Sequence, residues 1–266
     1  MKVNAMGLEV RVQPKSLVMH LEGRSYGTDL NEGGKHNQVL NHQKFIDRWT
    51  ETLATHRPNA EAPEQEKERR AGSRVLVIDA RMLMPDKDSG SLRMSNLVKS
   101  WAANHKVTFV PKNLASQEPY DSALEFAGVE VITAPYVLSI DEFLEQRGAE
   151  FETVVLSRLE VADELMDVVK ERCPDAQVIY DTVDLHFLRE QREMELLGKT
   201  TLPREAEETK QAELRAMDRA DVTWVVSTLE VDLLADECPD VDVRLVSNVH
   251  VEKLSLIHIS EPTRPY

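Results

Sequence analysis

From Arg74 to about His250, short apolar runs alternate with amphipathic stretches. The apolar runs are rich in β-branched residues and nearly continuous in apolar character, which is typical of strands buried on both faces. The predicted strands are Val75–Ile78, Val107–Val110, Val129–Thr133, Thr153–Leu156, Val178–Tyr180, Val222–Val226 and Val243–Val246. The predicted helices are Ser91–Asn104, Val161–Arg172 and Pro203–Arg219. This alternation predicts an α/β fold with an open, doubly wound and mostly parallel sheet.

The beginning of the chain follows a different pattern. Two β-like runs, Leu8–Val12 and Ser16–Leu21, precede a loop rich in glycine and asparagine. The stretch Gln38–His56 then places its apolar residues roughly on one helical face. Two short runs and one helix bury too little surface for an independent core. We therefore interpret residues 1–56 as a small α+β remnant of a larger domain.

Two further segments border the predicted α/β domain, which covers residues 73–253. Residues 57–72 have almost no large apolar side chain and are predicted to form a charged linker. At the other end, Leu254–Arg264 is identical to the translation of a common transposase-based sequencing adapter. We interpret residues 254–266 as an artefactual tail and exclude them from the fold prediction. The natural protein is expected to continue past about Lys253.

Composition limits the classes of partner. The 266-residue chain has a formal net charge of −15 and a pI of about 5.0. This acidity argues against non-specific nucleic-acid binding, although backbone N–H groups and single arginines can still hold a small anion. No apolar run is long enough to span a membrane, and no secretory signal is visible. With only two distant cysteines, Cys173 and Cys238, the chain is predicted to be cytoplasmic, with the inner face of the membrane as one location.

Polar residues beyond the carboxyl ends of the strands are the first candidates for a site, because open α/β sheets bind ligands there. Gly90 and Ser91 lie where the loop after the first strand meets a helix. A glycine there lets a phosphate approach the backbone, and the first helical N–H groups attract an anion. Alternatively, Ser91 caps the helix and Gly90 makes the turn. The loop matches neither the dinucleotide-binding glycine fingerprint nor a Walker A loop.

Later strand ends carry further candidates. Arg158 follows the fourth strand and either pairs with a ligand phosphate or carboxylate or forms a surface salt bridge. The fifth strand is followed by the densest polar cluster, which includes Asp181, Asp184 and His186. Asp184 is either a ligand-binding residue or a helix N-cap, and His186 is either a base or hydrogen-bonding group or a structural histidine. Ser227 after the sixth strand extends the polar rim.

Seven segments together resemble one enzyme family. They are R-V-L-V-I-D, P-D-K-D-S-G-S-L-R-M, V-T-F-V-P, V-V-L-S-R, V-I-Y-D-T-V-D-L-H-F-L-R-E, A-D-V-T-W-V-V-S and L-V-S-N-V-H. Over about Arg74–Val251 they are similar to the N-terminal Rossmann-like domain of group 1, GT-B-type retaining glycosyltransferases. In that family two Rossmann-like domains face each other across a cleft. The first mainly holds the acceptor and the second holds the nucleotide-sugar, so the resemblance implies that this second domain is a missing partner.

The same resemblance implies roles for individual residues. Gly90 and Ser91 match the family's first-loop glycine region, which approaches the donor diphosphate. His186 matches the active-site histidine near the transferred sugar, and Arg158 is a weaker match. Asp181 and Asp184 belong to the same segment as His186. The GT-B fold implies no metal or other cofactor, because helix N-termini and basic side chains offset the charge of the leaving diphosphate.

The N-terminal part has a resemblance of its own. The segments are G-L-E-V-R-V-Q-P-K-S-L-V-M-H-L-E-G-R-S-Y-G-T-D and Q-V-L-N-H-Q-K-F-I-D-R-W. They are similar to the end of family 2, GT-A-type glycosyltransferases, in which a histidine after the final strand completes a site for a divalent metal, Mn²⁺ or Mg²⁺. His20 is the matching position, but the aspartates that share the metal are absent from this chain. His20 can equally pair with Glu22 or with the backbone.

Together these resemblances predict a fragment of a bacterial tandem glycosyltransferase. The parent is expected to move a sugar from a nucleotide-sugar to a glycan or lipid-linked acceptor in surface polysaccharide assembly, and the fragment itself is expected to be inactive. The alternatives are a nucleotide-sugar epimerase of GT-B architecture and a non-catalytic Rossmann-like binding domain. A receiver-type signalling domain is disfavoured, because Ala80 follows Asp79 where a second acidic residue is required and Asp181 stands where a lysine is required. The sugar, nucleotide, acceptor, stereochemical outcome and oligomeric state stay open.

Overall fold

The computed structural model describes most of the chain. The described residues are 36–196, apart from positions 59–60, 62 and 69–70, then 204–249, and a few positions before residue 20. The chain divides into two compact units, Met1–Lys67 and Glu68–Tyr266. The second unit contains every predicted site residue except His20, and His20 lies outside the described residues.

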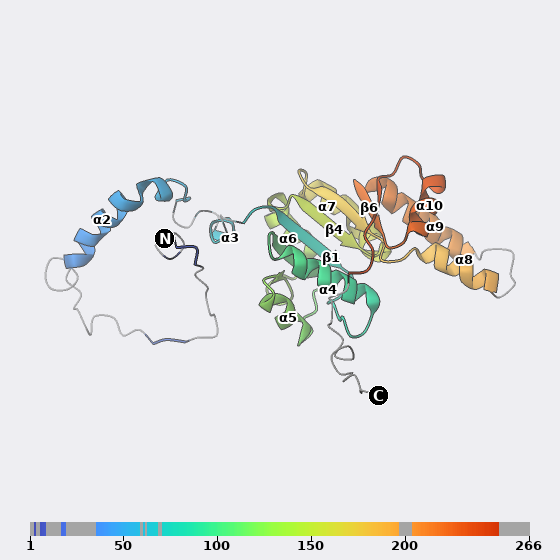
Figure 1. Ribbon diagram of the computed structural model, residues 1–266, viewed down its shortest axis with the longest axis horizontal. Coiled ribbons are helices and arrows are strands. Elements are labelled where there is room, and N and C mark those ends of the chain that lie inside the picture. Colours follow the sequence, from blue (N-terminus) through green and yellow to red (C-terminus); the bar gives the residue numbers. More distant parts are fainter. Residues whose placement is uncertain are drawn as a thin grey trace, which may run out of the picture. The chain divides into compact units, whose positions relative to one another are not determined.

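The described part of the first unit contains the helices α2 (His36–Leu53) and α3 (Pro63–Glu66) (Figure 1). α2 confirms the helix predicted over Gln38–His56. Within the second predicted β-like run, Leu17–Met19 are described, and they are exposed and belong to no strand. Most of the first predicted run lies outside the described residues, so that strand stays a prediction.

The second unit is built on a sheet whose seven described strands are all parallel. The strands are β1 (Arg74–Asp79), β2 (Lys106–Pro111), β3 (Glu130–Val131), β4 (Thr153–Ser157), β5 (Gln177–Asp181), β6 (Val222–Val225) and β7 (Val243–Leu245). Their order across the sheet is β3-β2-β1-β4-β5-β6-β7. The predicted doubly wound, parallel α/β fold is therefore confirmed. The strand order reverses between β1 and β4, and such a switch point is where open α/β sheets bind ligands.

Helices cover both faces of this sheet (Figure 1). The helices are α4 (Ser89–Trp101), α5 (Tyr120–Phe126), α6 (Ile140–Arg147), α7 (Leu159–Arg172), α8 (His186–Leu196), α9 (Arg204–Arg219) and α10 (Thr228–Glu237), with a 3₁₀ turn at Gly148–Glu150. Successive strand residues point to opposite faces. Val75 and Val77 therefore belong to the core under α4 and α5, whereas Leu76 and Ile78 belong to the core under α6, α7, α9 and α10.

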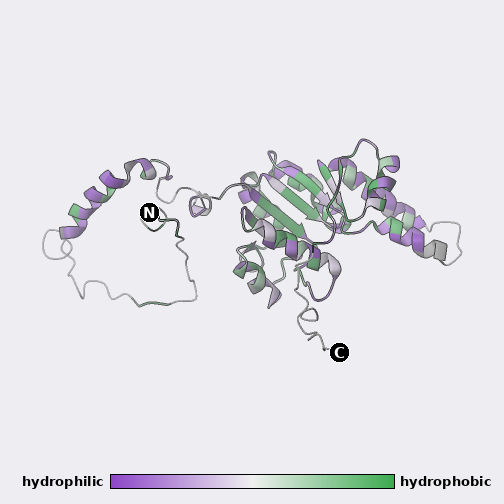
Figure 2. Ribbon diagram, viewed as in Figure 1, coloured by the Kyte–Doolittle hydropathy of each residue, from purple (hydrophilic) through white to green (hydrophobic). Residues whose placement is uncertain are grey.

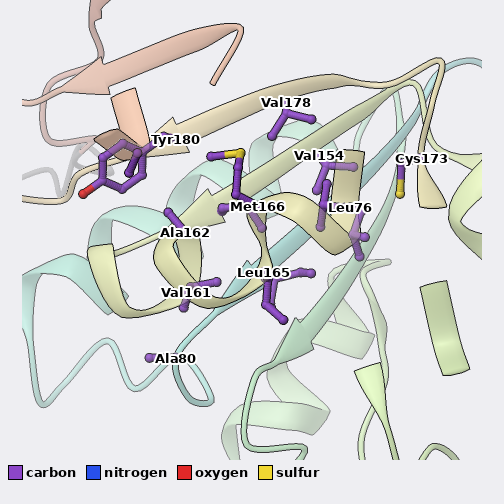
Figure 3. Packing of buried hydrophobic residues seen from close by; sticks show 14 of the residues in the cluster. Leu76, Ala80, Val154, Val161, Ala162, Leu165, Met166, Cys173, Val178 and Tyr180 are labelled. Atoms are coloured by element: carbon purple, nitrogen blue, oxygen red, sulfur yellow. The ribbon is translucent and has the colours of Figure 1, made fainter. Parts of the chain in front are cut away.

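α7 illustrates how an amphipathic pattern produces such a layer. It buries residues spaced one turn apart, and Figure 3 shows them against the strands. The contacting residues are Val161, Ala162, Leu165 and Met166 of α7 and Leu76, Val154 and Val178 of β1, β4 and β5. Each large aliphatic side chain buried there contributes about 1.5–3 kcal/mol relative to exposure. The strands are accordingly mostly hydrophobic, whereas the helices carry both kinds of residue (Figure 2).

The strand β3 is much shorter than the sequence predicts. The apolar run Val129–Thr133 forms only the two-residue strand β3, which pairs with Thr108 and Phe109 of β2. β3 lies at the edge of the sheet and has a single neighbour, so fewer of its residues are held in the ladder. Along the described chain, no helix combines the length and the apolar character needed to cross a membrane.

Candidate functional site

Three neighbouring strands end in buried polar residues at the switch point of the sheet. Asp79 ends β1, Ser157 ends β4 and Asp181 ends β5. The Ser157 hydroxyl donates a hydrogen bond to Asp79 at 3.0 Å and lies 3.4 Å from the nearer oxygen of Asp181. Because a hydroxyl has one proton, it cannot satisfy both carboxylates at once. Two buried carboxylates this close need cations beside them.

Two arginines supply those cations. Arg158 donates from Nε to Asp79 at 2.9 Å, and Arg93 donates from Nη1 to both oxygens of Asp181 at 2.8 Å. Burial raises the pKa of Asp79 and of Asp181, and the arginine beside each carboxyl opposes that rise. Substrate binding by Asp181 stays a prediction, but its carboxylate is already bonded to Arg93 within the fold.

The N-terminus of α4 faces a carboxylate of its own loop. Asp88 is the N-cap and accepts hydrogen bonds from the Ser91 N–H at 2.9 Å and the Ser91 hydroxyl at 2.5 Å. Partial burial opposes ionisation, but the bonds from Ser91 and from Arg158 Nη2 hold the pKa of Asp88 below its ordinary value. The alternative in which Ser91 caps the helix and Gly90 makes the turn is wrong, because α4 begins at Ser89. Phosphate contact at Gly90 and Ser91 stays a prediction, and a phosphate there has to displace Asp88.

Gly90 lies where a side chain has no room. A Cβ at this position would be 2.7 Å from Val183 Cγ1, 3.0 Å from Arg158 Nη2 and 3.1 Å from Asp88 Oδ1. Val183 itself has a φ of +65°, a conformation that β-branched residues rarely adopt. The loop after β5 therefore covers the first turn of α4. Two of the segments predicted to form one site, after β1 and after β5, lie beside each other.

This crowding gives a testable coupling between Gly90 and Val183. Gly90→Ala is expected to lower the free energy of unfolding by about 1–2 kcal/mol, because the new methyl overpacks against Val183. Val183→Gly removes that contact and relieves the positive φ. In urea unfolding, the double variant is expected to lose about 1 kcal/mol less than the sum of the two single losses. Strictly additive losses would contradict the close approach of the two segments.

His186 is the first residue of α8 and lies at the same edge of the sheet. Its Nε2 is 3.5 Å from Oδ1 of Asp184, whose other oxygen accepts a hydrogen bond from Arg189 at 2.6 Å. The interaction with Asp184 raises the pKa of His186 although partial burial opposes it. About 33% of the His186 side chain is exposed. The ring is therefore held by a carboxylate and still open to a hydroxyl or phosphate of a ligand.

The alternative in which Asp184 caps α8 is wrong. The N–H groups of His186 and Phe187 donate to the two oxygens of Glu213, a buried residue of α9, at 2.9 and 3.1 Å. The carboxylate of Asp184 is instead paired with His186 and Arg189. Ligand binding by Asp184 stays a prediction.

Three residues that shape this edge were not singled out by the sequence: Asp88, Arg93 and Glu213. The signal for Asp88 is readable, because an aspartate directly before an amphipathic stretch is a helix N-cap pattern. Arg93 and Glu213 lie inside helices, and their partners are far away in the sequence. Within the described residues, no group of three or more His, Cys, Asp or Glu is arranged to hold a metal ion.

Solved structures of similar fold include two proteins described with UDP-sugar chemistry. UGT2 of Phytolacca americana, complexed with UDP-2fluoro-glucose and pterostilbene, is 11% identical, with a TM-score of 0.46 over 72% of this chain and 57% of its own. A UDP-glucosyltransferase from Polygonum tinctorium is 12% identical, with the same TM-score and coverage. The lactate dehydrogenase of Cryptosporidium parvum is 15% identical, with a TM-score of 0.27 over 49% and 40%.

This chain spans less than two thirds of each of these structures, and the likeness is one of fold alone. No protein-family model matches the chain. A comparison with curated proteins also finds no match.

Proposed function

We propose that this chain is the acceptor-side domain of a GT-B-type glycosyltransferase, which moves a sugar from a nucleotide-sugar to a glycan or lipid-linked acceptor. The observation that carries the proposal is the placement of His186. The segment that resembles the family brings this histidine, paired with Asp184, to the carboxyl edge of the predicted parallel sheet. At that edge, Val183 of the same loop lies against Gly90 and the start of α4.

The reaction forms a bond between an acceptor hydroxyl oxygen and the anomeric carbon of the donor sugar. The bond from that carbon to the diphosphate breaks, and the nucleoside diphosphate leaves with the electron pair. The proton of the acceptor hydroxyl passes to a base or to the leaving diphosphate. His186 is suited to hydrogen-bond a hydroxyl of the sugar, because Asp184 holds its ring and part of the side chain is exposed.

The remaining parts of the proposal concern the parent protein. A second Rossmann-like domain supplies the nucleotide-sugar site, and this module uses no metal or other cofactor. An upstream family 2 module, whose end corresponds to residues 1–56, uses a divalent metal, with His20 as one ligand. The tandem enzyme acts in surface polysaccharide assembly.

The test starts from the uninterrupted source gene. Read past codon 253, it is expected to encode a second Rossmann-like domain, and the whole protein is expected to transfer sugar from a nucleotide-sugar panel to lipid-linked acceptors. His186→Ala is expected to lower the transfer rate about 10- to 100-fold, the usual value of one hydrogen bond to a reacting ligand. The matched control is His105→Ala, an exposed histidine before β2, at the opposite edge of the sheet, and it is expected to keep full activity.

Two outcomes would contradict the proposed function. One is a source gene without a second Rossmann-like domain. The other is an active protein in which His186→Ala and His105→Ala behave alike. Isomerisation of the free nucleotide-sugar without any acceptor would identify an epimerase instead.

A further inference from the structure

Glu213 has a buried carboxylate and lies in the middle of a helix. It lies within α9 and is fully buried. Burial of an ionised carboxylate is costly unless hydrogen bonds compensate it. Both oxygens of Glu213 accept hydrogen bonds from the main chain of α8, from the His186 N–H at 2.9 Å and from the Phe187 N–H at 3.1 Å.

These two N–H groups are the first of α8 and have no acceptor within their own helix. The residue directly before α8 is Leu185, which has no side-chain oxygen to cap them. Glu213, 27 positions after His186 in the chain, caps these N–H groups instead. The cap therefore fixes the start of α8 relative to α9, and α9 leads directly into β6 of the sheet.

The charges that face His186 come from three elements. Asp184 belongs to the loop before α8, Arg189 to the next turn of α8, and Glu213 to α9. Asp184 and Glu213 raise the pKa of His186, whereas partial burial and Arg189 lower it. Glu213 thus contacts the backbone of His186 and also contributes to the charge around its ring.

We propose that Glu213 is a positioning residue, which holds His186 at the carboxyl edge of the sheet through hydrogen bonds to the first two N–H groups of α8. The catalytic meaning of this inference rests on the proposed function. The contact between Glu213 and the start of α8 does not depend on the proposed function, and its effect on His186 can be measured on this chain without any substrate.

The test compares Glu213→Gln with Glu230→Gln in the full chain. Glu230 is the matched control, because it is also buried and caps its own helix, α10, through the N–H groups of Val226 and Ser227 at 2.9 and 3.0 Å. Glu213→Gln is expected to lower the pKa of His186 in NMR titration and to speed exchange of the Phe187 amide about tenfold. Glu230→Gln is expected to leave both quantities unchanged.

A second measurement needs no substitution. In the unmodified chain, the amide proton shifts of His186 and Phe187 are expected to follow the titration of Glu213. The positioning role would be overturned if the pKa of His186 were the same in Glu213→Gln as in the unmodified chain, or if Glu230→Gln changed it equally. It would also be overturned if the amide proton shift of His186 did not follow the titration of Glu213. If the whole protein with His186→Ala transferred sugar at the full rate, the proposed function would be contradicted, but the positioning role of Glu213 would still hold.

Discussion

Arg93→Ala is expected to lower the free energy of unfolding by about 3–5 kcal/mol, a large part of the stability of a domain of this size. The Arg93 side chain is 1% exposed. It donates to both oxygens of Asp181 at 2.8 Å and to the Val246 carbonyl at 2.8 and 3.1 Å. The substitution leaves the fully buried Asp181 without its cation and removes the donors from Val246. An uncompensated buried charge is among the costliest results of a single substitution.

Urea unfolding followed by circular dichroism measures this loss. Arg81→Ala removes an exposed arginine of the same unit and is expected to change stability by no more than about 0.5 kcal/mol. Arg93→Met combined with Asp181→Leu replaces the pair by apolar groups and is expected to recover more than half of the loss. A loss below about 1 kcal/mol for Arg93→Ala would show that the ion pair is not buried in solution.

The layers of this fold were predictable because burial on two faces leaves a clear pattern. β1 and β4 are short β-branched runs between longer amphipathic stretches, and such strands have few alternatives. The extent of β3 was not predictable in the same way. Its apolar run is as long as the others, but its length in the sheet depends on how many neighbours it has, which is a property of the assembled sheet.

Helix starts were partly readable. α10 begins at a capping box, in which Ser227 and Glu230 cap each other's backbone, and this spacing is visible in the sequence. We interpreted Ser227 only as part of a polar rim, so the helix was missed. α8 has no such signal, because its cap is Glu213 from another helix. A glutamate inside a highly charged stretch is indistinguishable by pattern from a solvated surface residue.

In the candidate site, too, some features were predictable from the sequence and others were not. The common edge was predictable because the strands are parallel, and Asp181, Arg158, Gly90 and His186 do lie there. The hydrogen-bond and ion-pair partners of these residues were not predictable in this way. The structure shows that Arg158 contacts two carboxylates of this chain, which matches the salt-bridge interpretation. The Arg158 side chain is more buried than a surface salt bridge implies. Contact of Arg158 with a ligand stays a prediction.

Arg158→Ala is the second substitution with a large expected effect, a loss of about 2–3 kcal/mol near neutral pH. Arg158 donates from Nε to Asp79 at 2.9 Å and from Nη2 to Asp88 at 3.1 Å. Without it, the donors to the buried Asp79 that remain among the described residues are the Ser157 hydroxyl and the Ala80 N–H. The expected loss is smaller than for Arg93, because part of the Arg158 side chain is exposed.

The loss is expected to depend on pH, mainly through the buried Asp79. Burial raises the pKa of Asp79 above its ordinary value of 3.8, and Arg158 opposes that rise, so the substitution raises the pKa further. A raised folded-state pKa gives stability that is present at low pH and lost as the pH rises through it. The gap between the unmodified chain and Arg158→Ala is therefore expected to be widest near neutral pH and to narrow as the pH falls toward 3.8.

Urea unfolding at a series of pH values measures that gap, and Asp79→Asn is the matched variant. In the Asp79→Asn background the neutral amide needs no cation, so Arg158→Ala is expected to cost less than half as much and to lose most of its pH dependence, with Asp88 as the carboxylate that still pairs with Arg158. A gap that stays constant with pH, or a cost unaffected by Asp79→Asn, would mean that Arg158 does not balance Asp79. If the whole cost is under about 0.5 kcal/mol, Arg158 is a surface group free to meet an anion, as the resemblance implies.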